Sequence, residues 1–390
     1  LFYYLGEKGY IILLLLSCIV NYCFGLLIAK FKNKTSLILG LIFNIGLLFY
    51  FKYTNFFFNT FANIFSFKTP TLNIILPLGI SFFTFQNVSY LIDVYRKDIS
   101  PEKNIFNYAT YITLFPQLVA GPIVRYSDIM KELASRKESI KLFSEGIERF
   151  IIGLAKKVII ADTIYGMYTN ILSYNLSMLS YILVAIGFTF QIYYDFSGYS
   201  DMAIGLGKMF GFNFKENFNY PLISSSITEF WRRWHMSLSG FFKDYVYIPL
   251  GGNRCSILKN ICNIFTVWIL TGLWHGASWN FIIWGLYFFV FLIFEKFVLK
   301  KYLKKGLLSH LYTFLIIIIS FVIFSVTDLS EILVFLKGMF GIGVPLYNKE
   351  ILYYLKNNII LLIIDSLGIS QFLKNKINTL KKCKLEIAIE

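Results

Sequence analysis

Long apolar runs without a charged residue recur along most of the chain. The runs at residues 163–194 and 260–294 each exceed the roughly 20 residues that one helix needs to cross a bilayer, and each could hold one long helix or parts of two. Further uncharged runs cover residues 10–29, 36–51, 69–92, 105–124 and 306–327, with a weaker candidate at 351–364. This pattern predicts an all-α polytopic membrane protein.

Two segments depart from the pattern of simple crossings. Residues 53–67 are rich in aromatic residues and contain three asparagines, which favours a helix lying at the membrane interface. Residues 105–124 have basic residues on both flanks and contain Pro116, Gly121 and Pro122. Both flanks can stay on the cytoplasmic side only if the segment enters the membrane and returns. Irregular backbone at that depth must be shielded or must line a cavity, so we expect a re-entrant segment beside a buried cavity.

The remaining segments give no sign of a second domain. Residues 125–162 have the charge density of an ordinary soluble helix and are expected to form a cytoplasmic surface helix that enters the membrane near residues 150–160. No linker and no internal repeat interrupts the chain. We therefore expect one membrane-embedded domain over residues 1–390. The chain begins with Leu1 rather than Met, which suggests a truncated N-terminus.

The composition supports a membrane protein and excludes other classes. Apolar residue types make up 57% of the 390 residues and charged residues 15%, against about 25% charged residues in an average soluble domain. The mean hydropathy of +0.63 excludes both a soluble globular protein and a disordered one. The net charge of +15 is best explained by cytoplasmic loops rich in Lys and Arg, at residues 30–34, 96–103 and 296–305. No nucleic-acid partner is expected.

The motifs of metal and phosphate sites are absent from the sequence. The five cysteines form no CxxC pair and there are only three histidines, so we infer neither a disulfide nor a metal site. Residues 250–253 (LGGN) are typical of a tight turn and lack the spacing of a phosphate-binding loop. Ser197 and Ser200 do not lie in the G-x-S-x-G context of a serine nucleophile.

One histidine stands out because it lies inside an uncharged run. His275 falls within residues 260–294, and an imidazole buried in a membrane is unfavourable unless it has a partner. The neighbouring Gly272, Gly276 and Ala277 leave room for a ligand, although small residues also serve close helix packing. Desolvation would keep this imidazole neutral and able to accept a proton. We therefore expect His275 to have a functional role.

Other polar groups cluster nearby in the sequence and leave alternatives open. His235 follows a tryptophan and fits either an aromatic belt at the interface or a second polar group of the same cavity. Asp195 and Asp201 could form a paired-carboxylate site, or they could be counter-ions for nearby bases, namely Arg232, Arg233 and Lys243. The two arginines could equally extend toward lipid headgroups. His310 is expected at the interface, without a catalytic role.

Six segments in order carry a family resemblance: residues 44–57, 76–96, 115–126, 190–207, 230–254 and 273–287. Their central motifs are FWRRWH at residues 230–235 and LWHG at residues 273–276. The segments resemble the membrane-bound O-acyltransferase (MBOAT) family, over roughly residues 1–300. The resemblance is to the bacterial polysaccharide O-acetyltransferase branch typified by alginate O-acetylation. A D-alanyl-transferring branch shares a W-x-R-W-H-M-S-L-S segment, whereas YIPLGGNR at residues 247–254 resembles the acetyl branch.

The resemblance implies a fold and an active site. The fold would contain roughly 9–11 transmembrane or re-entrant helices around a central tunnel. His275 would be the catalytic histidine and His235 the second polar residue of the active site. We expect six more residues to belong to the substrate tunnel: Trp231, Trp234, Trp274, Asn280, Asp195 and Asp244. The family's opening helix is missing before Leu1, and residues 371–390 are polar where the family has a further span.

The resemblance also implies a reaction. An acetyl group would pass from a cytoplasmic thioester, such as acetyl-CoA, to hydroxyl groups of a cell-surface or exported polysaccharide, with no bound cofactor and no metal. The expected location is the bacterial cytoplasmic membrane, and the expected partners are membrane lipids and an extracytoplasmic acetyltransferase partner. Alginate, cellulose and peptidoglycan all remain compatible as acceptors. The alternatives are D-alanyl transfer to teichoic acid and, in a different class, a proton-coupled transporter or flippase.

Overall fold

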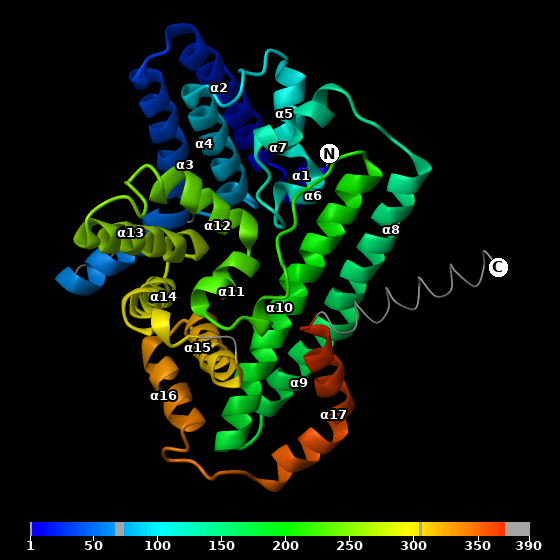
Figure 1. The fold of residues 1–390 in the computed structure, drawn as a ribbon, viewed down its shortest axis with the longest axis vertical. Helices are drawn as coiled ribbons and strands as arrows, with labels where there is room; N and C mark the ends of the chain where they lie inside the picture. Colours follow the sequence, from blue (N-terminus) through cyan, green and yellow to red (C-terminus); the bar gives the residue numbers. More distant parts are fainter. Residues whose placement is uncertain (1, 67–73, 304–305, 371–390) are drawn as a thin grey trace. The chain divides into compact units, whose positions relative to one another are not determined.

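A computed structural model describes residues 2–66, 74–303 and 306–370. Across these ranges the chain forms helices and no β-strand, which confirms the predicted all-α class (Figure 1). Seven helices in the described part are long and apolar enough to cross a membrane, which confirms a polytopic membrane protein. They are α2 (Tyr10–Phe31), α3 (Lys34–Phe65), α10 (Met178–Met209), α13 (Ile257–His275), α14 (Trp279–Phe297), α15 (Leu307–Ser325) and α17 (Lys349–Gly368).

Shorter helices complete the described chain. The regions predicted as spans at residues 69–92 and 105–124 contribute α4 (Ile80–Arg96) and α5 (Ile105–Thr113), which are shorter than the other seven. The remaining α-helices are α1 (Phe2–Glu7), α6 (Phe115–Leu118), α7 (Tyr126–Ala134), α8 (Ile140–Ala155), α9 (Asp162–Leu172), α11 (Ile227–Arg233), α12 (Met236–Phe242) and α16 (Leu329–Met339). Two π-helices, η1 (Lys156–Ala161) and η3 (Lys243–Tyr247), and two 3₁₀ turns, η2 (Pro221–Ile223) and η4 (Leu299–Lys301), lie between them.

Two compact units make up the chain. Unit 1 contains Leu1–Leu154, Ser197–Asn217 and Ser237–Phe281, and unit 2 contains Ala155–Phe196, Phe218–Met236 and Ile282–Glu390. Each unit is assembled from three segments that are distant in the sequence. The prediction of one membrane domain over the whole chain stays a prediction.

Helix α3 corrects the prediction for residues 36–67. The sequence pattern suggested a span at residues 36–51 and a separate interfacial helix at 53–67, divided by Lys52. The structure instead forms one continuous helix, Lys34–Phe65. No Gly or Pro interrupts this helix after Gly46, so nothing breaks it at Lys52. A single lysine is tolerated there because its ammonium group has partners within unit 1.

The two longest uncharged runs each contain two helices. Residues 163–194 are divided by residues 173–177 into α9 and the start of α10. Helix α10 then continues past the end of the run, through Asp195 and Asp201, to Met209. The run at residues 260–294 breaks after His275, where residues 276–278 separate α13 from α14. The break places His275 at a helix end rather than in the middle of a span.

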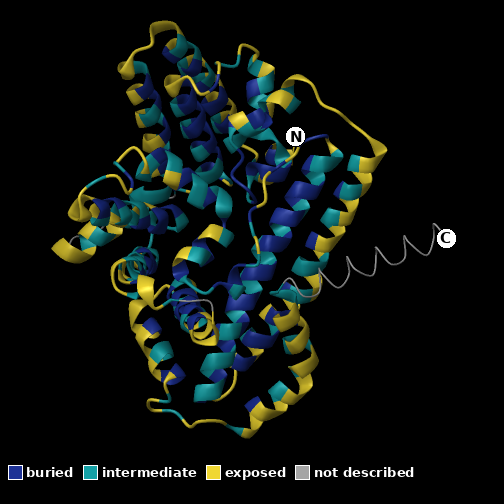
Figure 2. Cartoon of the chain, viewed as in Figure 1, coloured by how far each residue is buried: buried dark blue, intermediate teal, exposed yellow. Residues whose placement is uncertain are grey.

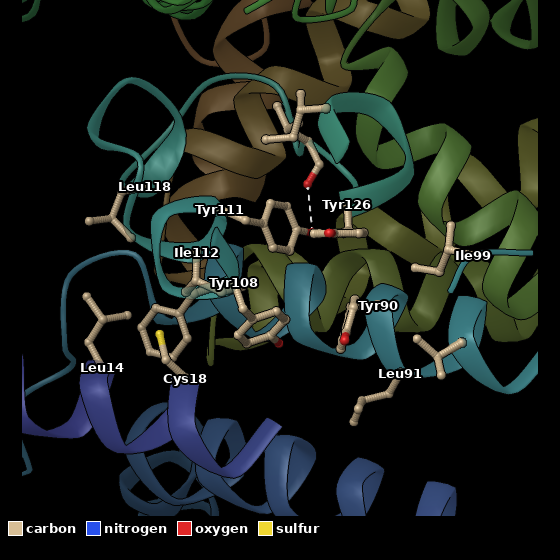
Figure 3. Packing of buried hydrophobic residues seen from close by; sticks show 14 of the residues in the cluster. Leu14, Cys18, Tyr90, Leu91, Ile99, Tyr108, Tyr111, Ile112, Leu118 and Tyr126 are labelled. Atoms are coloured by element: carbon tan, nitrogen blue, oxygen red, sulfur yellow. Dashed lines mark hydrogen bonds between the residues drawn. The ribbon is translucent and has the colours of Figure 1, made fainter. Parts of the chain in front are cut away.

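The segment predicted to be re-entrant breaks and turns back within unit 1. Helix α5 ends at Thr113, and the short α6, with Pro116 in its first turn, is followed by irregular backbone. Tyr111 donates a hydrogen bond from its hydroxyl to the carbonyl of Val124 at 3.2 Å, which closes the return (Figure 3). Tyr90, Tyr108, Tyr111 and Tyr126 pack together there, with ring centroids 4.7 Å apart for Tyr90 and Tyr108. Whether residues 105–124 enter the membrane stays a prediction.

Buried polar side chains link the helices of unit 1. Asn21 on α2 and Asn44 on α3 exchange amide hydrogen bonds, and both side chains are almost fully buried. Asn87 on α4 donates to the hydroxyl of Ser17 on α2 at 3.0 Å, and the hydroxyl of Tyr108 on α5 donates to Asn87 at 2.7 Å. Between apolar helices in lipid, such hydrogen bonds supply directional attraction that hydrophobic burial does not.

Glycines allow α8 to approach the last turns of α10 closely. A Cβ atom on Gly146 would lie 2.7 Å from the carbonyl oxygen of Gly205, and one on Gly153 would lie 2.5 Å from that of Gly198. The two glycines of α8 are seven residues apart, and so are the two of α10. Each helix therefore presents its glycines on one face. Small residues on facing helices are typical of tight packing in membranes.

Unit 2 is organised around α15. This helix packs against α11, α16 and the turn η2. The N-terminus of α11 is capped by Glu295 of α14, whose carboxylate accepts hydrogen bonds from the backbone N–H groups of Ile227 and Thr228 at 2.5 and 2.9 Å. The carboxylate is favourable there because a helix N-terminus carries partial positive charge. Helix α17 is mostly exposed and has only two buried residues, Ile351 and Asp365 (Figure 2).

The amide pair predicts a measurable coupling between α2 and α3. Asn44→Ala should lower the free energy of unfolding by about 1–3 kcal/mol, because it leaves the buried amide of Asn21 short of a partner. The double variant Asn21→Ala, Asn44→Ala should lose less than the sum of the two single variants, with a coupling of roughly 0.6–1.7 kcal/mol. Unfolding by steric trapping in bicelles would measure all three variants. Strictly additive losses would contradict a direct interaction.

Candidate active site

Helix α13 is anchored at its N-terminal end by a glycine turn. Gly251 and Gly252 have φ values of 112° and 54°, in the left-handed region that favours glycine, so the tight turn predicted at residues 250–253 is confirmed. Asn260 donates from its amide to the carbonyl of Gly252 at 2.7 Å, and Asn263 donates to that of Leu250 at 3.2 Å. The turn is therefore fixed to the first two turns of α13.

The C-terminal end of α13 is held by two neighbouring side chains of α3. The ammonium group of Lys52 donates to the carbonyl of Trp274 and, at 3.1 Å, to the hydroxyl of Ser81. The hydroxyl of Tyr53 donates to the carbonyl of Leu273 at 2.6 Å. The last carbonyls of a helix lack partners inside the helix, and a cation stabilises the partial negative charge that gathers there. Lys52 and Tyr53 therefore fix the backbone directly before residue 275.

That residue is His275, the last residue of α13. Its ring lies edge-on to Trp274, with centroids 5.0 Å apart, and nearly parallel to Phe281, at 6.5 Å. The side chain is partly buried, and its Nε2 atom is shielded from solvent. A Cβ atom on Gly276 would lie 2.1 Å from the ring of Phe281, so a larger residue directly after the histidine would require that ring to move. Asn280, in the first turn of α14, is fully buried in the same unit.

His235 lies in unit 2, in the turn that joins α11 to α12. Its φ of 43° is left-handed, a conformation in which histidine, asparagine and aspartate are enriched among non-glycine residues. The side chain is 1% exposed, and its ring meets that of Phe196 edge-on, with centroids 4.8 Å apart. The two histidines belong to different units, so their convergence in one cavity stays a prediction. Within its own unit, each imidazole contacts aromatic rings; His235 is buried and His275 is partly buried.

The tryptophans predicted for the tunnel are all buried among other aromatic rings. In unit 1, Trp274 stacks on Phe85 at 5.6 Å. In unit 2, Trp231 meets Phe288 edge-on at 4.9 Å, and Trp234 stacks on Phe230 at 5.4 Å. Of these tryptophans, Trp274 contacts the ring of His275 directly.

The aspartates form ion pairs on the sides of helices. Asp195 contacts Lys157 of η1 at 2.6 Å, and Asp244 contacts Arg125 at 2.8 Å, each with about a third of its side chain exposed. Asp201 contacts Arg149 of α8 at 2.6 Å. Each carboxylate therefore has a basic partner of its own. None of these partners is Arg232, Arg233 or Lys243, which the sequence suggested as counter-ions.

The two arginines shortly before His235 differ in exposure and in partners. Arg232 is exposed, whereas Arg233 contacts Glu229 one turn earlier at 2.8 Å. Partial burial disfavours the charged form of Glu229, but hydrogen bonds from Ser225 and Arg233 outweigh that effect, and the pKa of Glu229 lies below its ordinary value. The turn that carries His235 is thus stabilised on one side by an ionised carboxylate.

Lys52 and Tyr53 are the residues of this site that the sequence pattern did not identify. The sequence did contain a signal, because a lone lysine inside an otherwise apolar helix needs a partner. No group of His, Cys, Asp and Glu that could hold a metal ion occurs in the described residues. Tunnel positions for Trp231, Trp234, Trp274, Asn280, Asp195 and Asp244 stay a prediction.

Comparison with known proteins identifies relatives for most of this chain. The membrane-bound O-acyltransferase (MBOAT) family matches residues 96–334, a range that includes both histidines. The probable alginate O-acetylase AlgI of Pseudomonas aeruginosa is 41% identical over 354 residues, which cover 88% of this chain and 68% of the relative. The peptidoglycan O-acetyltransferase of Helicobacter pylori is 37% identical over 380 residues, covering 88% of this chain and 72% of the relative.

A more distant relative transfers a different group. The teichoic acid D-alanyltransferase of Bacillus subtilis is 33% identical over 267 residues, which cover 64% of this chain and 67% of the relative. The family match extends over more than half of the chain, and two O-acetyltransferases match most of its length. The chain belongs to the membrane-bound O-acyltransferase family and is a multi-pass membrane O-acyltransferase.

Proposed function

We propose that this protein transfers an acetyl group from a cytoplasmic acyl thioester to hydroxyl groups of an exported or cell-surface polysaccharide, with His275 as the general base. The observation that carries the proposal is the partly buried imidazole at the end of α13, whose Nε2 atom is shielded from solvent and whose backbone is fixed through Lys52 and Tyr53. The names of two relatives, an alginate O-acetylase and a peptidoglycan O-acetyltransferase, support an acetyl group and a polysaccharide acceptor.

The reaction needs one proton acceptor and no bound cofactor. The acceptor hydroxyl oxygen forms a bond to the thioester carbonyl carbon while the neutral imidazole of His275 takes its proton. The carbon–sulfur bond then breaks, and the imidazolium returns the proton to the leaving thiolate. General base catalysis of this kind typically contributes about 10²–10⁴-fold. The apolar rings beside the histidine would limit hydrolysis of the thioester by excluding water.

His235 serves this reaction in one of two ways. Its imidazole either donates a hydrogen bond to the thioester carbonyl oxygen or orients the ring of His275. His235→Asn separates the two, because asparagine tolerates the left-handed backbone and keeps a donor, but its shorter side chain cannot replace a ring contact. Substantial activity in this variant would favour the carbonyl contact.

The family and the basic loops support a proposal for where the reaction takes place and which partners it uses. We place the chain in the bacterial cytoplasmic membrane, with the Lys- and Arg-rich loops on the cytoplasmic side. Acetyl-CoA or another acyl thioester is the proposed donor, and an extracytoplasmic acetyltransferase partner is proposed to complete the transfer. Mass analysis of the ester released from the polymer distinguishes acetyl from D-alanyl transfer.

His275→Ala should lower the rate of polysaccharide O-acetylation by about 10²–10⁴-fold, because it removes the general base. The initial rate of ester formation by membrane-inserted protein is the measurement. His310→Ala is the matched control, because His310 is exposed and outside the proposed site. Undiminished ester formation in the His275 variant would reject the proposed role.

Lys52→Met should lower kcat by about tenfold with little change in the KM for the acceptor. The ammonium group positions His275 through the carbonyl of Trp274 and does not touch the substrate, and a tenfold effect corresponds to about 1.4 kcal/mol. Lys52→Arg should restore part of the rate, because a guanidinium can also donate to a carbonyl.

The control for Lys52 is Lys34→Met, at the exposed N-terminal end of the same helix. It should leave kcat within about twofold of the original protein, because surface substitutions away from specific contacts have small effects. A Lys52→Met protein with an unchanged kcat, or one in which only the KM rises, would contradict a positioning role.

A further inference from the structure

Helices α9 and α17 lie side by side in unit 2 (Figure 1). A polar groove lies between them. It has a volume of about 450 Å³, within the range of roughly 300–1,000 Å³ that is usual for ligand sites. Six of its lining residues carry uncharged hydrogen-bonding groups: Thr163, Asn170, Tyr353, Tyr354, Asn357 and Asn358. Neither candidate histidine lines it.

The asparagines of the groove are unusual for a helix of this kind. Helix α17 is apolar enough to cross a membrane, and Asn357 lies about 12 Å along it from Lys349. Asn358 donates to the carbonyl of Tyr354 at 3.0 Å. The side-chain amides of Asn357 and Asn170, however, make no hydrogen bond to any residue that the structure describes. Both side chains are exposed along the groove, so their amides can donate hydrogen bonds to a ligand there and accept them from it.

The residues that line the groove indicate which class of ligand it can bind. No Lys, Arg, Asp or Glu lines the groove. Phosphate headgroups are typically held by Arg and Lys, and cations by carboxylates, so a charged ligand would lack its usual partners. Carboxamides and phenols both donate and accept hydrogen bonds, and the two tyrosines add aromatic surface. A neutral sugar, with hydroxyl groups around its rim and apolar C–H faces, matches this combination.

The loops at one end of the groove indicate the side of the membrane that it faces. Residues 173–177 and 341–348 contain no Lys or Arg, and the first basic residue at this end is Lys349, in the first turn of α17. These two loops are joined by hydrogen bonds from Asn348 to the carbonyl of Asn175 at 2.6 Å and from Met178 to that of Pro345 at 2.9 Å. The basic residues Lys156 and Lys157 instead precede the opposite end of α9. By the positive-inside rule the groove opens in the extracytoplasmic half, where an exported glycan is found.

We propose that the polar groove binds neutral sugar units of the acceptor polysaccharide, as a holding site separate from the residues that carry acyl transfer. That the bound sugar belongs to the acceptor polysaccharide rests on the function proposed above. It also narrows the acceptor, because a polymer of charged uronate units would find no basic partner in this groove.

The test is a binding measurement on the full chain in lipid nanodiscs, with three hexasaccharide probes. Cellohexaose and chitohexaose are neutral, and hexamannuronate carries a carboxylate on every unit. We expect at least one neutral probe to bind, with about tenfold weaker binding by the Asn170→Ala, Asn357→Ala variant, the loss expected from two hydrogen bonds. Ile359→Ala is the matched control, because Ile359 is exposed on α17 outside the lining.

The outcomes separate this proposal from the proposed function. Acetyl transfer to a small soluble alcohol should be unchanged in the double variant, while the KM for a polymeric acceptor should rise. Loss of transfer to both acceptors would overturn a separate holding site. Three further results would also overturn the proposal: no binding of either neutral probe, equal binding of hexamannuronate, or a groove occupied by a phospholipid or by a second copy of the chain in native mass spectrometry or cross-linking.

Discussion

The C-terminal end of α13 is the constraint on which the candidate active site depends. A helix leaves its last carbonyls without partners, and His275 is the final residue of this one. Lys52 and Tyr53 satisfy the carbonyls of Trp274 and Leu273, so the imidazole is fixed by α3. Helix α3 is in turn tied to α2 by buried amides. The position of one ring therefore depends on the packing of several helices.

The sequence predicts those features that follow from local patterns. Uncharged runs predicted the all-α membrane class, and glycines predicted the turn at residues 250–253, because both depend on residues that are close in the chain. His275 was recognisable as a candidate for a related reason, since a polar residue inside an uncharged run needs an explanation. The family match supports acyl transfer, the reaction class that the LWHG motif around His275 suggested.

The remaining features depend on contacts between distant residues. Lys52 marked a boundary between two predicted helices, yet it lies within one continuous helix in the structure. The local pattern could not show this, because the partners of its ammonium group, Ser81 and the carbonyl of Trp274, lie far from it in the sequence. Asp195 and Asp244 pair with Lys157 and Arg125, neither of which their local sequence indicates. Charge patterns show that such residues need partners, but only the tertiary fold selects which ones.

An experimental structure of the protein with a non-hydrolysable acyl thioester and an acceptor sugar would show whether His275 acts as the general base. We expect an imidazole nitrogen of His275 within about 2.6–3.2 Å of the acceptor hydroxyl, the reach of a general base, with Lys52 on the carbonyl of Trp274. A thioester carbonyl bound far from this imidazole, or a ring of His275 turned toward lipid, would contradict it.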